Sequence, residues 1–231
     1  MKKISAIICP LLALLIVLGA CGSTNDDSSA DTSETPQPAQ TPAPAPSPTP
    51  IPADDELVRV KDYIPDIITD LKYATTDNFT GVVIYDDSTA YLRYGTVKKL
   101  AAAQRELAKS GYSLLICDAY RPVSAQYRLW EVCPNPVYVS DPTKGFSKHS
   151  RGNTVDISLV KTNGDAVEMP SVFDDFTSRA DRDYSDVSQA AGDNARYLEK
   201  VMTDAGFAGY SGEWWHYSDS TEYPVMQQLM K

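Results

Sequence analysis

Two short stretches hold the side chains best suited to metal chemistry. The chain has only two histidines: His149 stands seven positions before Asp156 in "SKHSRGNTVDISLV", and His216 stands three positions after Glu213 in "GEWWHYSD". Histidine and carboxylate side chains are both good zinc ligands, and a hydrolytic zinc site uses three protein ligands and leaves the fourth position to water. His149, Asp156 and His216 would supply these three ligands.

Glu213 would have a different role in such a site. Water bound to zinc needs a base that takes its proton as it attacks a carbonyl, and a carboxylate beside the metal is suited to this. Because Glu213 and His216 would face opposite sides of a regular strand, a turn or bulge is required if both serve one site. Arg121, in "SLLICDAYRP", is the best candidate to stabilise the negative charge that develops on the carbonyl oxygen.

Each of these residues also has an ordinary structural interpretation. A histidine beside a turn is commonly a surface or satisfied core residue, and Trp214 and Trp215 could pack in the core rather than stack on a substrate. Asp156 could bond to a turn, and Arg121 could pair with Asp118. Spacing alone leaves the zinc site and these alternatives open.

The elements that must position these residues mix helices and strands without a regular rhythm. Apolar spacing in "TVKKLAAAQRELAKSGY" and "DNARYLEKVMTDAG" predicts helices that end near Gly111 and Gly206, and "VSAQYRLWEV" is a candidate for another helix. A buried strand is expected over Ser113–Cys117, and residues 154–160 alternate as a strand whose Asp156 points away from the hydrophobic face. This predicts an α+β fold, a single domain with a small antiparallel sheet flanked by helices and a zinc site in the central cleft.

The N-terminal residues have the layout of an export signal. Residues 1–20 combine two lysines with an apolar run and small residues before Cys21. The "LGAC" ending resembles the bacterial lipoprotein signal, in which the thiol of Cys21 is lipidated before cleavage, and two acyl chains would anchor the protein stably to a bacterial membrane outside the cytoplasm. An uncleaved membrane-spanning helix is the alternative, for which the run is short and interrupted by Pro10.

The amino-acid composition divides the rest of the chain into a tether and a folded domain. Residues 21–54 are rich in Pro, Ser, Thr and Ala, which predicts a disordered tether that could span on the order of 100 Å. Residues 55–231 remain for the catalytic domain, and their number is sufficient for one hydrophobic core. The formal net charge of −10 argues against a nucleic-acid partner, which needs clustered lysines and arginines, and against electrostatic adhesion to anionic lipid.

The chain has four cysteines, of which Cys9 would leave with the signal and Cys21 is the lipidation site. Outside the cytoplasm the remaining Cys117 and Cys133 could form a disulfide. The alternative is two separate small core residues, since Cys117 ends an apolar run where it would be buried in any case. The sequence leaves this choice open.

The motifs together resemble a known family. "SKHSRGNTVDISL" and "GEWWHY" are similar to segments of the zinc D-alanyl-D-alanine dipeptidases of the vancomycin-resistance type, within the D,D-carboxypeptidase-like zinc peptidases. Four further segments look like family segments in family order: "LKYATTDNFTG", "GYSLLICDAYRP", "FDDF" and "MTDAGFAGYSGEWWHY". The resemblance runs from about Leu57 to the C-terminus.

The resemblance implies one zinc ion per chain, held by the three ligands named above, with Glu213 as base and Arg121 as the transition-state arginine. Three further positions match contacts to the bound dipeptide: Tyr73, Ser147 and Asp174. Asp174 would receive the free ammonium of the dipeptide, with Asp175 as a competitor one residue away.

The implied reaction is hydrolysis of D-alanyl-D-alanine, or a closely similar dipeptide, by metal-activated water. The family's resistance enzyme works in the cytoplasm, whereas this chain looks exported, so a D,D- or L,D-carboxypeptidase that trims peptidoglycan stem peptides is an alternative. A non-catalytic cell-wall-binding lipoprotein is another, although it would need neither Glu213 nor Arg121. A structural zinc domain would need a fourth protein ligand, which Cys117 or Cys133 could supply.

Overall fold

The computed structural model of the chain describes residues 50–226. The export signal, Cys21 and nearly all of the tether lie outside these residues. The described residues belong to one compact unit, Thr49–Lys231. No helix within residues 50–226 has the length and apolar character needed to cross a membrane.

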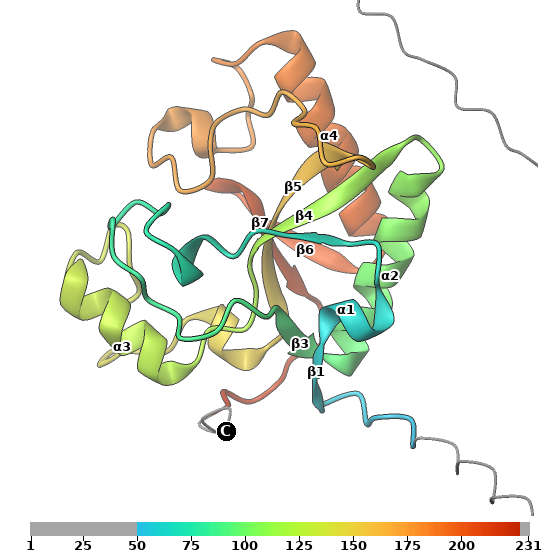
Figure 1. Cartoon of the computed structure of the whole chain (residues 1–231). Coiled ribbons are helices and arrows are strands. Elements are labelled where there is room, and N and C mark those ends of the chain that lie inside the picture. The colour runs from blue at the N-terminus through green and yellow to red at the C-terminus, as the bar shows by residue number, and fades with distance from the viewer. Residues whose placement is uncertain (1–49, 227–231) are drawn as a thin grey trace, which may run out of the picture. The chain divides into compact units, whose positions relative to one another are not determined.

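A five-stranded sheet forms the centre of the domain (Figure 1). Its strands, in spatial order, are β2 (Ile68–Thr69), β4 (Tyr112–Asp118), β5 (Thr154–Lys161), β7 (Glu213–Asp219) and β6 (Phe207–Tyr210). The α+β class is confirmed, but the expectation of an antiparallel sheet is wrong at one edge, because β2 pairs with β4 in the parallel sense. The chain between them is long and contains a helix, which provides the crossover that a parallel pair requires.

A second, two-stranded sheet lies near the start of the domain. It pairs β1 (Leu57–Arg59) with β3 (Tyr91–Arg93), and α1 (Val60–Tyr63) follows β1 directly. The remaining helices are α2 (Tyr94–Ala108), α3 (Val123–Val132) and α4 (Gln189–Asp204), with 3₁₀ turns η1 (Lys72–Ala74), η2 (Lys148–Arg151) and η3 (Ser178–Ala180). All three helices expected from the sequence are therefore confirmed.

The hydrophobic core lies between the sheet and helices α2 and α4, which also contact each other. Leu100 of α2 and Leu198 of α4 are completely buried, as the helical periodicity predicts. Along β5 the side chains of Ile157 and Leu159 are also fully buried, while Asp156 between Val155 and Ile157 projects to the opposite face of the sheet. The sheet thus separates the apolar core from the face that carries the polar site.

Both cysteines of the described domain are free. Cys117 is buried near the end of β4, and burial raises the pKa of its thiol, which makes the thiol unreactive. Cys133 is half-buried and packs against the core. Of the two interpretations of the sequence, the structure supports two separate residues rather than a disulfide.

Candidate metal centre and active site

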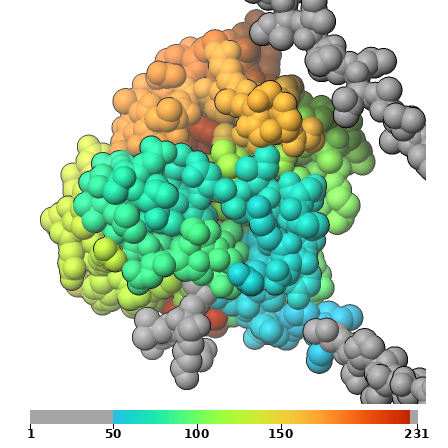
Figure 2. All heavy atoms as spheres, in the orientation of Figure 1, coloured from blue at the N-terminus to red at the C-terminus, as the bar shows by residue number. Residues whose placement is uncertain are grey.

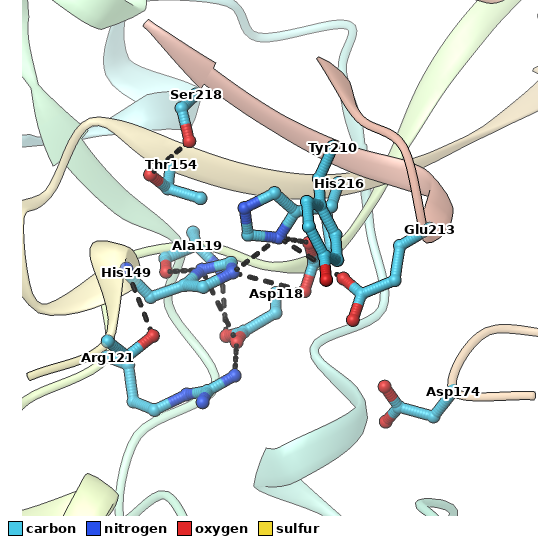
Figure 3. Close-up of polar contacts among 12 residues, drawn as sticks. Asp118, Ala119, Arg121, His149, Thr154, Asp174, Tyr210, Glu213, His216 and Ser218 are labelled. Carbon is cyan, nitrogen blue, oxygen red and sulfur yellow. Dashed lines mark hydrogen bonds and ion pairs between the residues drawn. The ribbon is translucent and has the colours of Figure 1, made fainter. Parts of the chain in front are cut away.

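Three side chains from three elements converge on one point. His149 comes from η2, Asp156 from β5 and His216 from β7, and one donor atom from each lies within 4.8 Å of the others. The two histidine rings are labelled in Figure 3. His216 Nδ1 is 3.0 Å from Asp156 Oδ1, and His149 Nε2 is 3.3 Å from Asp156 Oδ2. Asp156 and His216 stand directly opposite each other in the antiparallel β5–β7 pair, so the register of the sheet brings these two ligands together.

The short turn η2 positions His149. Ser147 begins the turn, where its Oγ accepts a hydrogen bond from the His149 N–H at 3.3 Å, and Gly152 ends it in the left-handed conformation with φ of 75°. Arg93 stabilises the end of the turn with two hydrogen bonds of 2.8 Å each. Its backbone N–H donates to Gly152 O, and its Nε donates to Arg151 O. A non-glycine residue at 152 would be strained by the positive φ and would press on Arg93.

The imidazole of His149 is fixed in one tautomer. Its Nδ1 lies 2.8 Å from Ala119 O, and a carbonyl oxygen can only accept, so the proton is on Nδ1. This leaves the Nε2 lone pair directed at Asp156 and His216. Metal-binding histidines commonly have such a backbone partner on the second ring nitrogen.

The donor set fits a divalent metal ion. Burial alone would raise the pKa of Asp156, but His149 and His216 outweigh burial and hold that pKa well below its usual range, so the carboxylate is ionised. Its Oδ1 is buried and has no hydrogen-bond partner, although His216 Nδ1 is only 3.0 Å away. A cation bound among the three donor atoms would satisfy both of these atoms.

A bulge in β7 places Glu213 beside this cluster. Gly209 of β6 pairs with Tyr217, but the next residue, Tyr210, pairs with Glu213, so residues 214–216 of β7 have no partner on β6. Glu213 Oε2 consequently lies 3.5 Å from His216 Nδ1. The predicted departure from regular strand geometry is confirmed. Burial, with the nearby charge of Asp156, raises the pKa of Glu213, which makes its carboxylate a stronger proton acceptor than that of an exposed glutamate.

The two tryptophans within the bulge belong to the core. Trp214 is 2% exposed and Trp215 is 1% exposed. Trp214 Nε1 donates to Ser171 Oγ at 2.9 Å, and the Trp215 ring contacts the edge of Phe173 with centroids 5.7 Å apart. The core interpretation is confirmed, and these contacts support the segment that carries Asp174.

Arg121 is held in a buried polar network. Its Nη2 pairs with Asp118 Oδ2 at 2.6 Å, its Nη1 donates to Gln126 Oε1 at 3.0 Å, and its Nε donates to the Tyr85 hydroxyl at 3.3 Å. The pairing with Asp118 that the structural interpretation of Arg121 allowed is therefore present. Asp118 Oδ2 is also 3.6 Å from His149 Nδ1, so the arginine and the metal cluster share one carboxylate (Figure 3).

Three members of this network, Asp118, Gln126 and Tyr85, were not assigned to the site from the sequence. Asp118 carries a recognisable signal, because a charged residue at the end of an apolar strand needs a partner. Tyr85, whose hydroxyl donates to Asp118 Oδ1, comes from an irregular segment with no pattern that marks it. Only the folded chain brings Tyr85 to Asp118.

Tyr73 and Asp174 meet although they are far apart in the chain. The Tyr73 hydroxyl donates to Asp174 Oδ2 at 2.9 Å. Burial, reinforced by the charge of Asp156, raises the pKa of Asp174 to about 8. Asp175 instead accepts a hydrogen bond from the Thr177 N–H at 2.9 Å and stabilises a local turn. The structure therefore brings Asp174 to Tyr73 and leaves Asp175 outside.

The surface is hollowed where segments of different parts of the chain meet. Figure 2 shows a depression between the cyan-to-teal atoms and the orange atoms, with red atoms of the C-terminal part of the domain at its base. In Figure 3 the Asp174 carboxyl group lies apart from the metal cluster, with Glu213 between them.

A buried set of two imidazoles and one carboxylate, with a second carboxylate beside it and an arginine network behind it, defines a metal-dependent hydrolase. The peptidase M15 family, described as D-Ala-D-Ala dipeptidase, matches residues 53–231. The chain belongs to this family, which confirms the resemblance drawn from the motifs.

Relatives named D-alanyl-D-alanine dipeptidase align over most of their length. The protein of Escherichia coli K12 is 39% identical over 74% of this chain and 89% of its own. The protein of Enterococcus faecalis V583 is 36% identical over 64% of this chain and 83% of its own length. The protein of Streptomyces coelicolor is 34% identical over 69% of this chain and 89% of its own length. A crystal structure of the vancomycin-resistance D,D-pentapeptidase VanY with Zn(II) is 15% identical over 59% of this chain and 76% of its own, with a TM-score of 0.39.

Proposed function

We propose that the protein hydrolyses D-alanyl-D-alanine, or a closely similar dipeptide, to free amino acids with one zinc ion per chain. Asp174 is the observation that carries the assignment of a free dipeptide. It is a half-buried carboxyl group that accepts a hydrogen bond from Tyr73 and has no ion pair among residues 50–226. The free ammonium of a dipeptide would supply the missing cation, because a buried carboxylate is stable only when it is paired.

His149, Asp156 and His216 would hold the zinc ion, and their number leaves a coordination position open. A zinc ion held by these residues would supply Lewis acidity, which would make a water molecule more acidic and polarise the scissile carbonyl. Neither Cys117 nor Cys133 joins the three ligands in the part of the chain that the structure describes. This argues against the alternative of a closed structural zinc site.

Glu213 would take the proton of the attacking water and pass it to the departing amine. Its carboxylate is suited to this because the bulge holds it next to His216. Arg121 would stabilise the negative charge on the carbonyl oxygen. Asp118, Tyr85 and Gln126 already orient its guanidinium, so little reorganisation is needed during the reaction.

Ser147 and Tyr73 would contact the bound dipeptide. Ser147 begins the turn that carries His149, so its hydroxyl lies next to the metal ligand. Tyr73 packs its ring against the Arg121 guanidinium, 5.1 Å from the ring centroid, while its hydroxyl reaches Asp174. Tyr73 thereby joins the two ends of the proposed substrate site.

The two other functions fit these groups less well. A D,D- or L,D-carboxypeptidase acts on a residue whose amino group is acylated, and such a substrate brings no cation to Asp174. A non-catalytic cell-wall-binding lipoprotein needs neither a base at Glu213 nor an arginine at Arg121. Both alternatives predict that a capped peptide binds or reacts at least as well as a free dipeptide.

A substrate panel tests the proposal directly. The zinc-loaded protein is incubated with D-alanyl-D-alanine, L-alanyl-D-alanine, N-acetyl-D-alanyl-D-alanine and a pentapeptide stem, and released D-alanine is measured. We expect release from a free dipeptide and little from the acetylated dipeptide or the stem. Release from the acetylated dipeptide or the stem at a rate comparable with the free dipeptide would overturn the assignment.

We also propose that residues 1–20 direct export, that Cys21 carries the lipid, and that residues 21–54 tether the domain to the bacterial membrane. The support is the residue pattern of the signal and its "LGAC" ending. Cys21→Ser should move the protein from the membrane fraction to the soluble fraction and abolish incorporation of labelled fatty acid. Membrane retention and labelling equal to those of the unaltered chain would contradict lipidation.

A further inference from the structure

The bulge that directs Glu213 into the site also leaves part of β7 without strand pairing on its β6 side. Residues 214–216 of β7 face no partner on β6, so the sheet does not satisfy their backbone groups on that side. Trp214 and Trp215 are buried in this region, and buried backbone carbonyls need hydrogen-bond donors. Something other than strand pairing must therefore stabilise the bulge.

Arg182 supplies these donors. It lies in the segment between η3 and α4, and its Nη2 donates to Trp214 O at 3.1 Å and to His216 O at 3.0 Å. Its Nε donates to Tyr210 O at 2.8 Å, on the opposite strand, and its backbone N–H donates to Ser211 O at 3.1 Å. One side chain thus bridges both strands across the bulge.

The surroundings of Arg182 hold the guanidinium in this place. It lies over the Tyr217 ring, 4.5 Å from the centroid, and its Nη1 is 3.3 Å from Glu199 Oε1. Gly209 makes room for it, because a Cβ at this position would lie 2.5 Å from Arg182 Cζ. Lysine has no planar fork and could not reproduce this set of contacts to several carbonyl groups.

We infer that Arg182 is a positioning residue for the reaction, which stabilises the β6–β7 bulge and thereby holds Glu213 and His216 on the same side of β7. Regular pairing would place these two side chains on opposite faces. Arg182 acts through the backbone of Trp214 and His216 and has no role at the reacting atoms. The part of this inference that concerns Glu213 as base rests on the proposed function.

Arg182→Met tests the inference, with Arg196→Met as the matched control. Arg196 also lies over a tyrosine, 5.2 Å from the Tyr184 centroid, and pairs with Asp193 at 3.3 Å, but on the exposed surface of α4. For Arg182→Met we expect kcat on D-alanyl-D-alanine to fall about 100-fold with KM changed less than about threefold, because misplacing a catalytic group by about 1 Å has an effect of this size. Arg196→Met should leave both constants unchanged.

A metal readout makes the test independent of dipeptidase activity. Cobalt(II) is bound in place of zinc, its absorption spectrum is recorded, and zinc affinity is measured by competition with a chromogenic chelator. Arg182→Met should alter the cobalt spectrum and weaken zinc binding about tenfold, as loss of a group that orients a ligand does. If the unaltered protein fails to cleave any dipeptide, the proposed function fails, and this readout still decides the positioning role.

The inference would be overturned if Arg182→Met folds and its kcat, KM and zinc affinity all stay within about threefold of those of the unaltered protein. Such changes would be smaller than those expected when a group that orients a ligand is lost. If Arg182→Met does not fold, Gly209→Ala decides, because the added Cβ displaces the guanidinium without removing its charge. Lower kcat and weaker zinc binding in Gly209→Ala would support the positioning role, and unchanged values would overturn it.

Discussion

Asp174→Asn separates the charge of this side chain from its shape. The asparagine can still accept the hydrogen bond from Tyr73 that Asp174 Oδ2 accepts at 2.9 Å. It cannot take the negative charge whose burial, reinforced by Asp156, raises the pKa of Asp174 to about 8. We therefore expect the substitution to raise the stability of the metal-free domain and to lower the activity of the zinc-loaded protein.

The effect on stability follows from proton linkage. The unfolded chain has an aspartate pKa near 3.9, whereas the folded metal-free domain has a pKa of about 8 at Asp174. Between these values the folded state holds a proton that the unfolded state has released, so stability falls as pH rises, by about 1.4 kcal/mol per pH unit. The asparagine variant lacks this pH-dependent loss. Its free energy of unfolding, relative to that of the parent, should therefore rise by on the order of 5 kcal/mol between pH 4 and pH 8.

The effect on activity comes from the lost pairing with the substrate ammonium. Removal of one partner of a buried, hydrogen-bonded charge pair costs about 2–5 kcal/mol. The value of kcat/KM for the free dipeptide should therefore fall by about 30-fold to 5,000-fold. The acetylated dipeptide has no ammonium, so its much lower rate should change little.

Urea unfolding of the metal-free domain at several pH values measures the first effect, and steady-state kinetics of the zinc-loaded protein measure the second. Asp175→Asn is the matched control, because Asp175 accepts only a turn hydrogen bond from Thr177 that asparagine can also accept. The reasoning is refuted if Asp174→Asn keeps the pH slope of the parent, or if it lowers the rates for free and acetylated dipeptides equally.

Three further predictions concern the metal centre and the arginine network. Glu213→Ala should lower kcat by about 10² to 10⁴-fold while zinc remains bound, which turnover assays and metal analysis would check, and unchanged turnover would remove the proposed base. Dialysis against a chelator should lower the thermal unfolding midpoint, and zinc at about 100 times its Kd should then stabilise the folded state by about 2.7 kcal/mol. A midpoint that does not change on addition of zinc would contradict the metal site. Tyr85→Phe removes a hydroxyl that donates to Asp118 and accepts from Arg121, so urea unfolding should show a loss of about 1–3 kcal/mol together with a lower kcat; parental values of both would show that this hydroxyl is dispensable.

Much of the site could be predicted because its residue types are rare in this chain and chemically specific. With only two histidines present, a hydrolytic metal site had few ways to form, and the spacing of Glu213 and His216 already required the bulge that the structure contains. The helices and β5 were also predictable, since periodicity in sequence directly reflects which face of a local element is buried.

Other features arise only when distant segments pair. The parallel pairing of β2 with β4 depends on the path of the crossover between them, and the choice of Asp174 over Asp175 depends on Tyr73, which lies 101 positions away. The contact of Tyr85 with Asp118 and that of Arg182 with the β6–β7 bulge likewise join segments that are distant in the sequence. The sequence by itself determined which groups could bind a metal and move a proton, because those abilities belong to single side chains. Tertiary structure decided their partners, because burial and hydrogen bonding depend on which segments the fold brings together.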